Sequence, residues 1–297
     1  MSASTEAFTQ VGAVEICYQT FGNPNGEPLL LIMGLGGPMT WWDDALCERI
    51  ADEGFHVARF DNRDTGRSTK LPGEVKRQDV VNAFLHLRDR SHYSLNDMAS
   101  DAVGVMDALG WSAAHVVGIS MGGMIAQTLA ISYPTRVKSL VSMSSTSGRR
   151  GVGWQSPKML ALLLEGTGTD LDSYVRRSLR SWQIIGSPDF PPDPEVLRAR
   201  AEATYHRGAY LDGQMHHIMA VASQPDRTKA LRQLQLPVTV LHGRQDLMVH
   251  VSGGKATAAA VPKSELLVLD GWGHDLPPEL FDTFAHIFAT TASRAVG

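Results

Sequence analysis

The sequence predicts an α/β fold in which a mainly parallel sheet has helices packed on both of its faces. Short apolar runs typical of buried strands alternate with helical patterns over most of the 297 residues. The composition supports this prediction, because 43% hydrophobic and 20% charged residues can form a full-sized core and exclude a disordered chain. The 28 glycines exceed the usual share and gather after predicted strands.

The strand predictions rest on runs of apolar and β-branched residues bounded by turn residues. Residues 14–21 mix apolar and polar side chains and end at the turn cluster 22–26, which indicates an early hairpin strand. Residues 29–33 are continuously apolar, as in a strand buried on both faces. Further strands are expected at 55–60, 115–119, 137–143, 238–242 and 265–269, and core helices near 42–53, 96–109, 121–132 and 280–290.

The interval from about 148 to 228 interrupts this alternation, because it contains no buried-strand pattern. We therefore predict a core domain formed by 1–147 and 229–297 and a helical lid at 148–228, placed to cover the carboxyl edge of the sheet. A small helical domain without a part in the chemistry is the alternative. The helical patterns of this interval lie at 158–165, 171–185, 194–206 and 211–223.

Charge and cysteine content exclude several classes of protein. The net charge of −4 and the pI near 6.2 do not provide the basic face that nucleic-acid binding needs. Cys17 and Cys47 cannot supply a disulfide framework, and the first residues lack the basic and apolar regions of a secretory signal. No apolar stretch approaches the ~20 residues of a bilayer span. We expect a cytoplasmic protein that binds neither nucleic acid nor membrane.

A glycine-flanked serine follows the strand predicted at 115–119. Gly118-Ile-Ser120-Met-Gly122 stands between that strand and a helix, where a sharp turn brings neighbouring backbone too close for side chains. Two glycines remove those clashes and leave the Ser120 hydroxyl at the strand's tip. The helix begins at the same point, so its free N–H groups face a developing oxyanion. Ser120 is therefore the candidate nucleophile; an inert serine in a glycine-rich turn is the alternative.

A serine nucleophile needs a base and an acidic partner that orients the base. Asp246 follows the strand predicted at 238–242, and His274 lies in a loop after the strand predicted at 265–269. The chain order is then serine, acid, histidine. The weaker alternatives are His242 as the base and either Asp270 or Asp275 as the acid.

The loop after the strand at 29–33 is the second glycine-rich feature. In Gly34-Leu-Gly-Gly-Pro38 the glycines let backbone N–H groups approach a substrate closely. Together with the turn at Ser120, this loop predicts an oxyanion hole whose donors are the N–H groups of Leu35 and Met121. Met39 occupies the place of the third glycine of a dinucleotide loop, which argues against such a loop.

No metal is expected, because the chain has no His-Glu-x-x-His or Cys-x-x-Cys motif, and the adjacent His216 and His217 cannot face one site together.

Taken together, these motifs resemble the serine hydrolases of the α/β-hydrolase fold over essentially the whole chain. The landmarks are Met-Gly-Leu-Gly at 33–36, Asp-Asn-Arg-Asp-Thr-Gly-Arg-Ser at 61–68, the Ser120 turn, 242–246 and 273–274. The form of 61–68, the chain length and the lid placement are similar to those of the aclacinomycin methylesterase-like esterases. Many family members carry His where this chain has Met33, a departure that concerns hydrogen bonding in the loop and not its backbone donors.

The resemblance implies a mostly parallel eight-stranded sheet flanked by helices, with the lid inserted after strand 6. It also implies acyl transfer without a cofactor: His274 takes the proton of Ser120, and Asp246 orients the imidazole. Serine at position 120 argues against haloalkane dehalogenases and epoxide hydrolases, which use aspartate there. A non-catalytic receptor of this fold would not need all three residues.

Aromatic side chains in the lid indicate an apolar pocket, and we predict that the substrates are small to medium hydrophobic or aromatic esters. The candidate substrate contacts are Gly34, Trp154, Trp182 and Trp272. Packing within the lid is the alternative for most of its aromatic residues. A lactonase, a carbon–carbon bond hydrolase, a perhydrolase or an aminopeptidase resembling the proline iminopeptidases could use the same three catalytic residues.

Overall fold

A computed structural model describes residues 3–84, 91–159 and 170–295. At its centre lies an eight-stranded sheet with the strand order β1-β2-β4-β3-β5-β6-β7-β8. The first three strands in this order pair antiparallel, and all pairs from β4 to β8 are parallel. The strands are β1 (Ala7–Val11), β2 (Val14–Phe21), β3 (Glu27–Ile32), β4 (Phe55–Phe60), β5 (Ala114–Ile119), β6 (Val137–Met143), β7 (Val238–Gly243) and β8 (Glu265–Leu269).

β1 has no counterpart among the predicted strands. It is a short edge strand whose residues alternate between half-buried and exposed, so its sequence carries no buried run. The hairpin turn lies at 12–13, where Gly12 has a φ of +59°. The turn cluster at 22–26 instead connects β2 to β3, which lie on opposite sides of β4.

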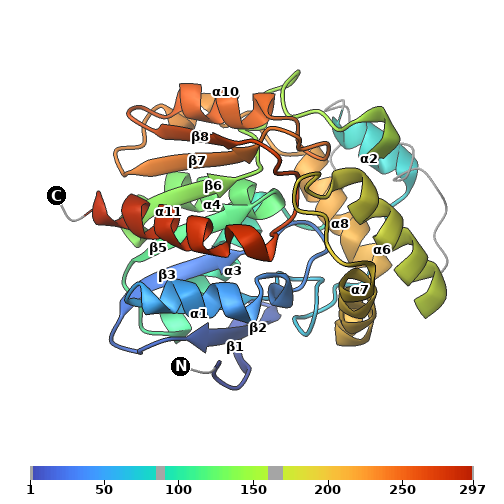
Figure 1. Cartoon of the computed structure of the whole chain (residues 1–297), viewed down its shortest axis with the longest axis horizontal. Helices are drawn as coiled ribbons and strands as arrows, with labels where there is room; N and C mark the ends of the chain where they lie inside the picture. Colours follow the sequence, from blue (N-terminus) through green and yellow to red (C-terminus); the bar gives the residue numbers. More distant parts are fainter. Residues whose placement is uncertain (1–2, 85–90, 160–169, 296–297) are drawn as a thin grey trace.

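Helices cover both faces of the sheet, as the alternation of strands and helices predicts (Figure 1). In β3, Leu29 and Leu31 point to the face covered by α1 and α11, while Leu30 and Ile32 point to the face covered by α3 and α4. The core helices are α1 (Asp44–Asp52), α2 (Arg77–Phe84), α3 (Leu95–Ala108), α4 (Met121–Ser132), α10 (Ser252–Ala260) and α11 (Phe281–Ser293), with 3-10 turns η1 (Met39–Trp41), η2 (Pro134–Arg136) and η3 (Pro278–Leu280).

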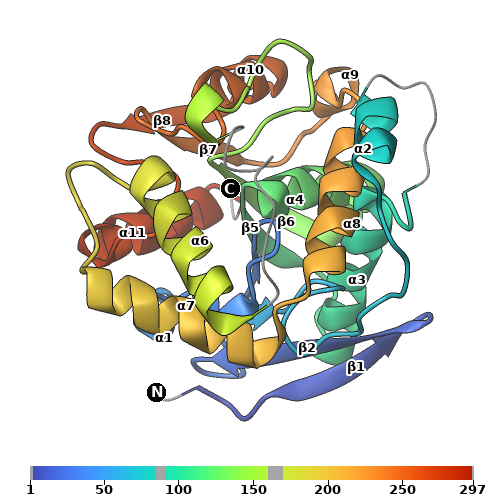
Figure 2. The same cartoon turned by 90° about the vertical axis from the view of Figure 1, so that its right-hand side faces the viewer.

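We call the segment between β6 and β7 the insertion. It contains α6 (Leu171–Ile185), α7 (Pro194–Gly208), α8 (Leu211–Ala222) and the short α9 (Thr228–Leu231). Figures 1 and 2 show α6, α7 and α8 gathered at one edge of the sheet, with α2 packed beside α8. The helices predicted at 171–185, 194–206 and 211–223 are confirmed. The helix predicted at 158–165 falls mostly on 160–169, outside the described residues.

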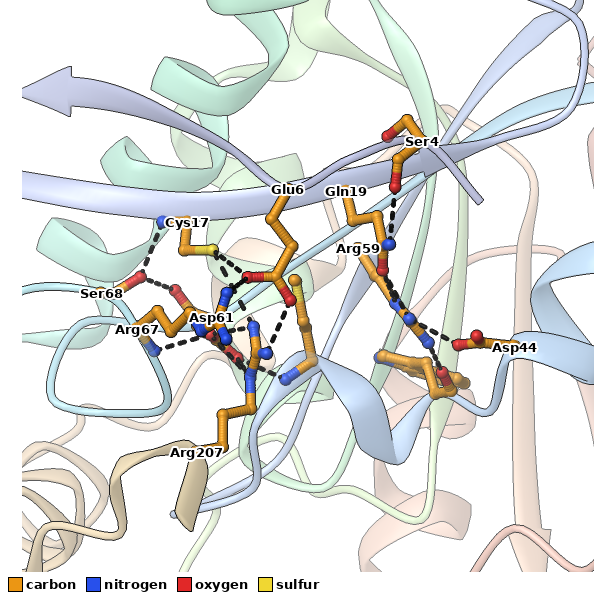
Figure 3. A network of polar contacts seen from close by, with 12 residues as sticks. Ser4, Glu6, Cys17, Gln19, Asp44, Arg59, Asp61, Arg67, Ser68 and Arg207 are labelled. Carbon is orange, nitrogen blue, oxygen red and sulfur yellow. Dashed lines mark hydrogen bonds and ion pairs between the residues drawn. The ribbon is translucent and has the colours of Figure 1, made fainter. Parts of the chain in front are cut away.

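Arg207, in the last turn of α7, joins the insertion to the core (Figure 3). Its two terminal nitrogens lie 2.7 Å from Asp61 Oδ2 and 2.7 Å from Glu6 Oε1. The buried Asp61 carboxylate also accepts the N–H groups of Met39 and Arg67, at 2.7 and 2.8 Å. These partners offset the cost of burying the charge. The loop after β4, the N-terminal segment and α7 are thereby held together.

In the described part of the chain, no helix has both the length and the apolar character that crossing a membrane requires.

Candidate active site

Ser120 occupies the turn between β5 and α4. Its φ of +57° and ψ of −122° are strained for a residue with a side chain. A Cβ on Gly122 would lie 2.0 Å from the Ile32 carbonyl oxygen, and one on Gly118 would lie 2.2 Å from the Gly122 oxygen. Both glycines are therefore needed for the strand to turn directly into the helix, which brings Ser120 to the carboxyl end of β5.

Asp246 and His274 come together from the loops after β7 and β8. His274 Nδ1 lies 2.7 Å from Asp246 Oδ2, and since a carboxylate only accepts, Nδ1 carries the proton. The other oxygen, Asp246 Oδ1, accepts the N–H groups of Met248 and Val249 at 2.9 and 2.8 Å. His274 and Ser120 line the same cavity. The arrangement leaves Nε2 of His274 free to take a proton.

The alternative acids and base are less well placed. His242 Nε2 lies 2.7 Å from the Val249 carbonyl oxygen and 3.5 Å from Asp246 Oδ2, but the ring is fully buried and is not among the described residues that line the cavity. Burial lowers the pKa of His242. Asp270 is exposed and pairs with Arg244 at the surface. Asp275 lines the cavity, but its carboxylate is hydrogen-bonded to the backbone N–H and the hydroxyl of Ser187, and burial raises its pKa.

The loop after β3 lies directly against Ser120. A Cβ on Gly34 would lie 3.1 Å from the Ser120 Cβ, so only glycine allows this approach without displacement. Leu35 lines the cavity, and Met121 is the first residue of α4. Within the described residues, neither Leu35 nor Met121 donates its N–H to a hydrogen bond. Two free donors therefore flank the serine.

A histidine of the insertion holds this loop, a role that the sequence around 216–217 did not indicate. His217, on α8 and fully buried, accepts the Gly36 N–H at Nδ1 (3.1 Å), and its Nε2 lies 2.8 Å from the Arg63 carbonyl oxygen. Burial lowers the pKa of His217 to about 4, so the ring is neutral at pH 7 and can accept at Nδ1. Asn62 donates to the Met33 carbonyl oxygen at 2.9 Å. With Met33 in the place of the usual His, the loop is thus held by a hydrogen bond that Asn62 donates to it and one that His217 accepts from it.

The cavity has a volume of about 180 Å³ and lies between the core and the insertion. Of the four candidate substrate contacts, Gly34 and Trp182 line it. Trp154 does not: it is 52% exposed and stacks on His250, with ring centroids 4.2 Å apart. Trp272 is fully buried against Phe284 and donates its indole N–H to the Asp275 carbonyl oxygen (2.8 Å), so it supports the loop that carries His274. The insertion contributes these further lining residues: Met159, Tyr174, Arg177, Ser178, Ser181, Ile185, Arg200, Leu211 and Gln214.

Comparison with known proteins identifies the family of the chain. The alpha/beta hydrolase fold family matches residues 27–279. Rhodomycin D methylesterase DauP of Streptomyces sp. (strain C5) is 29% identical in an alignment 295 positions long that covers 92% of this chain and 93% of that protein. A 2-hydroxy-6-oxononadienedioate/2-hydroxy-6-oxononatrienedioate hydrolase of Pseudomonas sp is 26% identical over 99% of this chain and 100% of its own length.

A solved structure has the same architecture. The enol-lactonase from Burkholderia xenovorans LB400 superposes with a TM-score of 0.75 at 19% identity, covering 97% of this chain and 100% of that one. At this identity the likeness of the two structures concerns the fold alone. The family assignment rests on the family match, which covers most of the chain. The chain therefore belongs to the alpha/beta hydrolase fold family.

Proposed function

We propose that the protein is a serine hydrolase that cleaves carboxylic esters with apolar or aromatic groups, and that residues 148–228 act as its lid. The observation that carries the proposal is that Ser120, His274 and Leu35 line one cavity, with Asp246 bound to His274 and the free N–H of Met121 next to Ser120 in the chain. The similarity to rhodomycin D methylesterase supports ester hydrolysis. The mainly apolar lining of the cavity supports a hydrophobic substrate.

The mechanism follows from these positions. As Ser120 attacks the ester carbonyl, its proton passes to Nε2 of His274, and Asp246 stabilises the imidazolium that forms. The negative charge on the carbonyl oxygen is bound by the N–H groups of Leu35 and Met121. His274 then protonates the departing alcohol, and a water activated by the same imidazole releases the acid. A lactone would open by the same steps.

Covalent labelling tests this proposal. A fluorophosphonate should modify the folded protein once, with the adduct located on Ser120 by peptide mass spectrometry, because the probe reacts with activated serines. p-Nitrophenyl esters should be hydrolysed with a burst, and faster than aminoacyl p-nitroanilides. An unlabelled Ser120 in the folded protein, or a preference for the anilides, would contradict the esterase assignment.

Two substitutions of His217 test the support of the oxyanion loop. Asparagine places an amide oxygen near the position of Nδ1, so it can still accept the Gly36 N–H. Glutamine reaches the position of Nε2 and can donate to the Arg63 carbonyl oxygen, but it leaves the Gly36 N–H without an acceptor. We expect His217→Gln to lower kcat for an ester by ~10-fold with little change in KM, and His217→Asn to lower it less.

Thermal melting provides the control for both His217 variants, because each removes one hydrogen bond of a buried ring. Similar losses of stability together with different losses of kcat would support the role of the Gly36 contact. Equal losses of kcat in the two variants would contradict it.

A further inference from the structure

Arg200, on α7, brings a positive charge to an otherwise mainly apolar part of the cavity. Its Cζ lies 4.4 Å from the ring centroid of Trp182 and 5.7 Å from that of Trp41. The two indole rings contact each other edge-on, with centroids 5.3 Å apart. The guanidinium therefore rests on an aromatic wall. Cation–π contacts of this kind stabilise a charge that is partly removed from water.

Within the part of the chain that the structure describes, no hydrogen bond or ion pair of this side chain is found, although Asp275 and Asp43 lie close enough to act on its charge. Asp275 shares the cavity, but its carboxylate is hydrogen-bonded to Ser187. Arg177 also lines the cavity and already has interaction partners. Burial lowers the pKa of Arg200, but an arginine side chain stays protonated at neutral pH.

Arg207 on the same helix shows the difference between a structural arginine and Arg200. Arg207 binds two carboxylates, Asp61 and Glu6. Arg200 is half-buried and has no carboxylate at hydrogen-bond distance among the described residues, so an arriving anion would recover part of the free energy of removing its charge from water. The planar fork of arginine matches a carboxylate with two parallel hydrogen bonds, which are strengthened in an apolar cavity.

We propose that Arg200 forms a subsite for an anionic group of the substrate, so that preferred substrates are aromatic esters carrying a carboxylate away from the scissile bond. This inference rests on the proposed function, because the same cavity holds Ser120. The carboxylate binds the guanidinium fork, and the aromatic part of the substrate packs among Trp41, Trp182 and the apolar lining. The subsite adds selection by charge to the hydrophobic selection that the lining provides.

Matched esters test the subsite. Methyl 4-carboxybenzoate and its neutral isostere methyl 4-carbamoylbenzoate differ in charge and little in shape. We expect the charged-to-neutral ratio of kcat/KM to fall ~10- to 100-fold in Arg200→Gln relative to the unsubstituted protein. Arg198→Gln is the matched control, since Arg198 lies on the same helix with an exposed side chain, and there the ratio should not change. Arg200→Lys keeps the charge and should retain part of the preference, which covers a failure of Arg200→Gln to fold.

The same comparison with 4-carboxyphenyl acetate and 4-carbamoylphenyl acetate places the charge on the alcohol side of the bond. A charged-to-neutral ratio that is the same in Arg200→Gln and the unsubstituted protein for both ester pairs would overturn the subsite.

Calorimetric titration of Ser120→Ala with methyl 4-carboxybenzoate separates the subsite proposal from the proposed esterase function. Binding to Ser120→Ala that is lost when Arg200 is also replaced, together with no ester turnover by the unsubstituted protein, supports the subsite and contradicts the esterase function. Ester turnover by the unsubstituted protein that is unchanged in Arg200→Gln contradicts the subsite alone.

Discussion

Replacing Ser120 by alanine is expected to lower kcat for ester hydrolysis by roughly 10⁶-fold, because the proposed acyl bond forms on the Ser120 oxygen and alanine has no group that can replace it. Substrate binding should persist, since the apolar lining and the backbone donors of Leu35 and Met121 are unchanged. The residual rate then reports what binding and the oxyanion hole contribute without a nucleophile. Stopped-flow or end-point assays with a p-nitrophenyl ester, together with a competitive binding measurement, would detect both effects.

Ser120→Gly provides a separate measure of the strain at this position. Glycine adopts φ values near +57° without the steric cost that serine bears, and that cost is about 1–3 kcal/mol. The extra freedom of glycine in the unfolded chain offsets part of this gain, so we expect an inactive variant that is more stable by about 1 kcal/mol. A lower melting temperature for Ser120→Gly than for Ser120→Ala would contradict the interpretation that the turn is strained.

Asp246→Asn should have the second-largest effect, a loss of roughly 10⁴ in kcat with the fold retained. The reason lies in the two N–H groups of Met248 and Val249, which point at Oδ1. They require an oxygen at that position, so the new amide must turn its NH₂ group toward His274 Nδ1. The imidazole then has to accept at Nδ1 and carry its proton on Nε2, where it can no longer take the proton of Ser120.

The matched control for this substitution is Asp270→Asn. Asp270 lies in the turn after β8, and its side chain is 74% exposed in an ion pair with Arg244. Surface pairs of this kind contribute little to stability, so activity and melting temperature should remain near those of the unsubstituted protein. Equal losses in the two variants would show that a nonspecific change in charge, and not the orientation of His274, explains the result.

The strands and turns of the fold were predictable wherever a residue pattern has a single physical cause. The run at 115–119 is mainly apolar because β5 is buried on both faces, and backbone contacts as close as 2.0 Å require Gly118 within the run and Gly122 after it. β1 escaped prediction because an edge strand with one exposed face needs no apolar run.

The lining of the cavity was less predictable, because an aromatic residue has the same sequence signal whether it faces a site, the core or solvent. Trp182 lines the cavity, whereas Trp154 lies at the surface and Trp272 in the core. His217 was missed for a related reason. Its role depends on Gly36 and Arg63, which are distant in the sequence and come beside α8 only in the folded chain.

The contacts of α7 and α8 with the core limit which insertions from related proteins could replace the insertion of this chain. Arg207 binds Asp61, His216 Nδ1 lies 2.9 Å from Asp64 Oδ2, and His217 binds the Gly36 N–H. An insertion transplanted from another family member would therefore remove supports of the loops at 34–37 and 61–68 as well as the present cavity lining. Exchange of the insertion is expected to yield active chimeras only when these two loops are exchanged with it. Specificity in this protein would then evolve more readily by single substitutions in α6 and α7 than by replacement of the whole insertion.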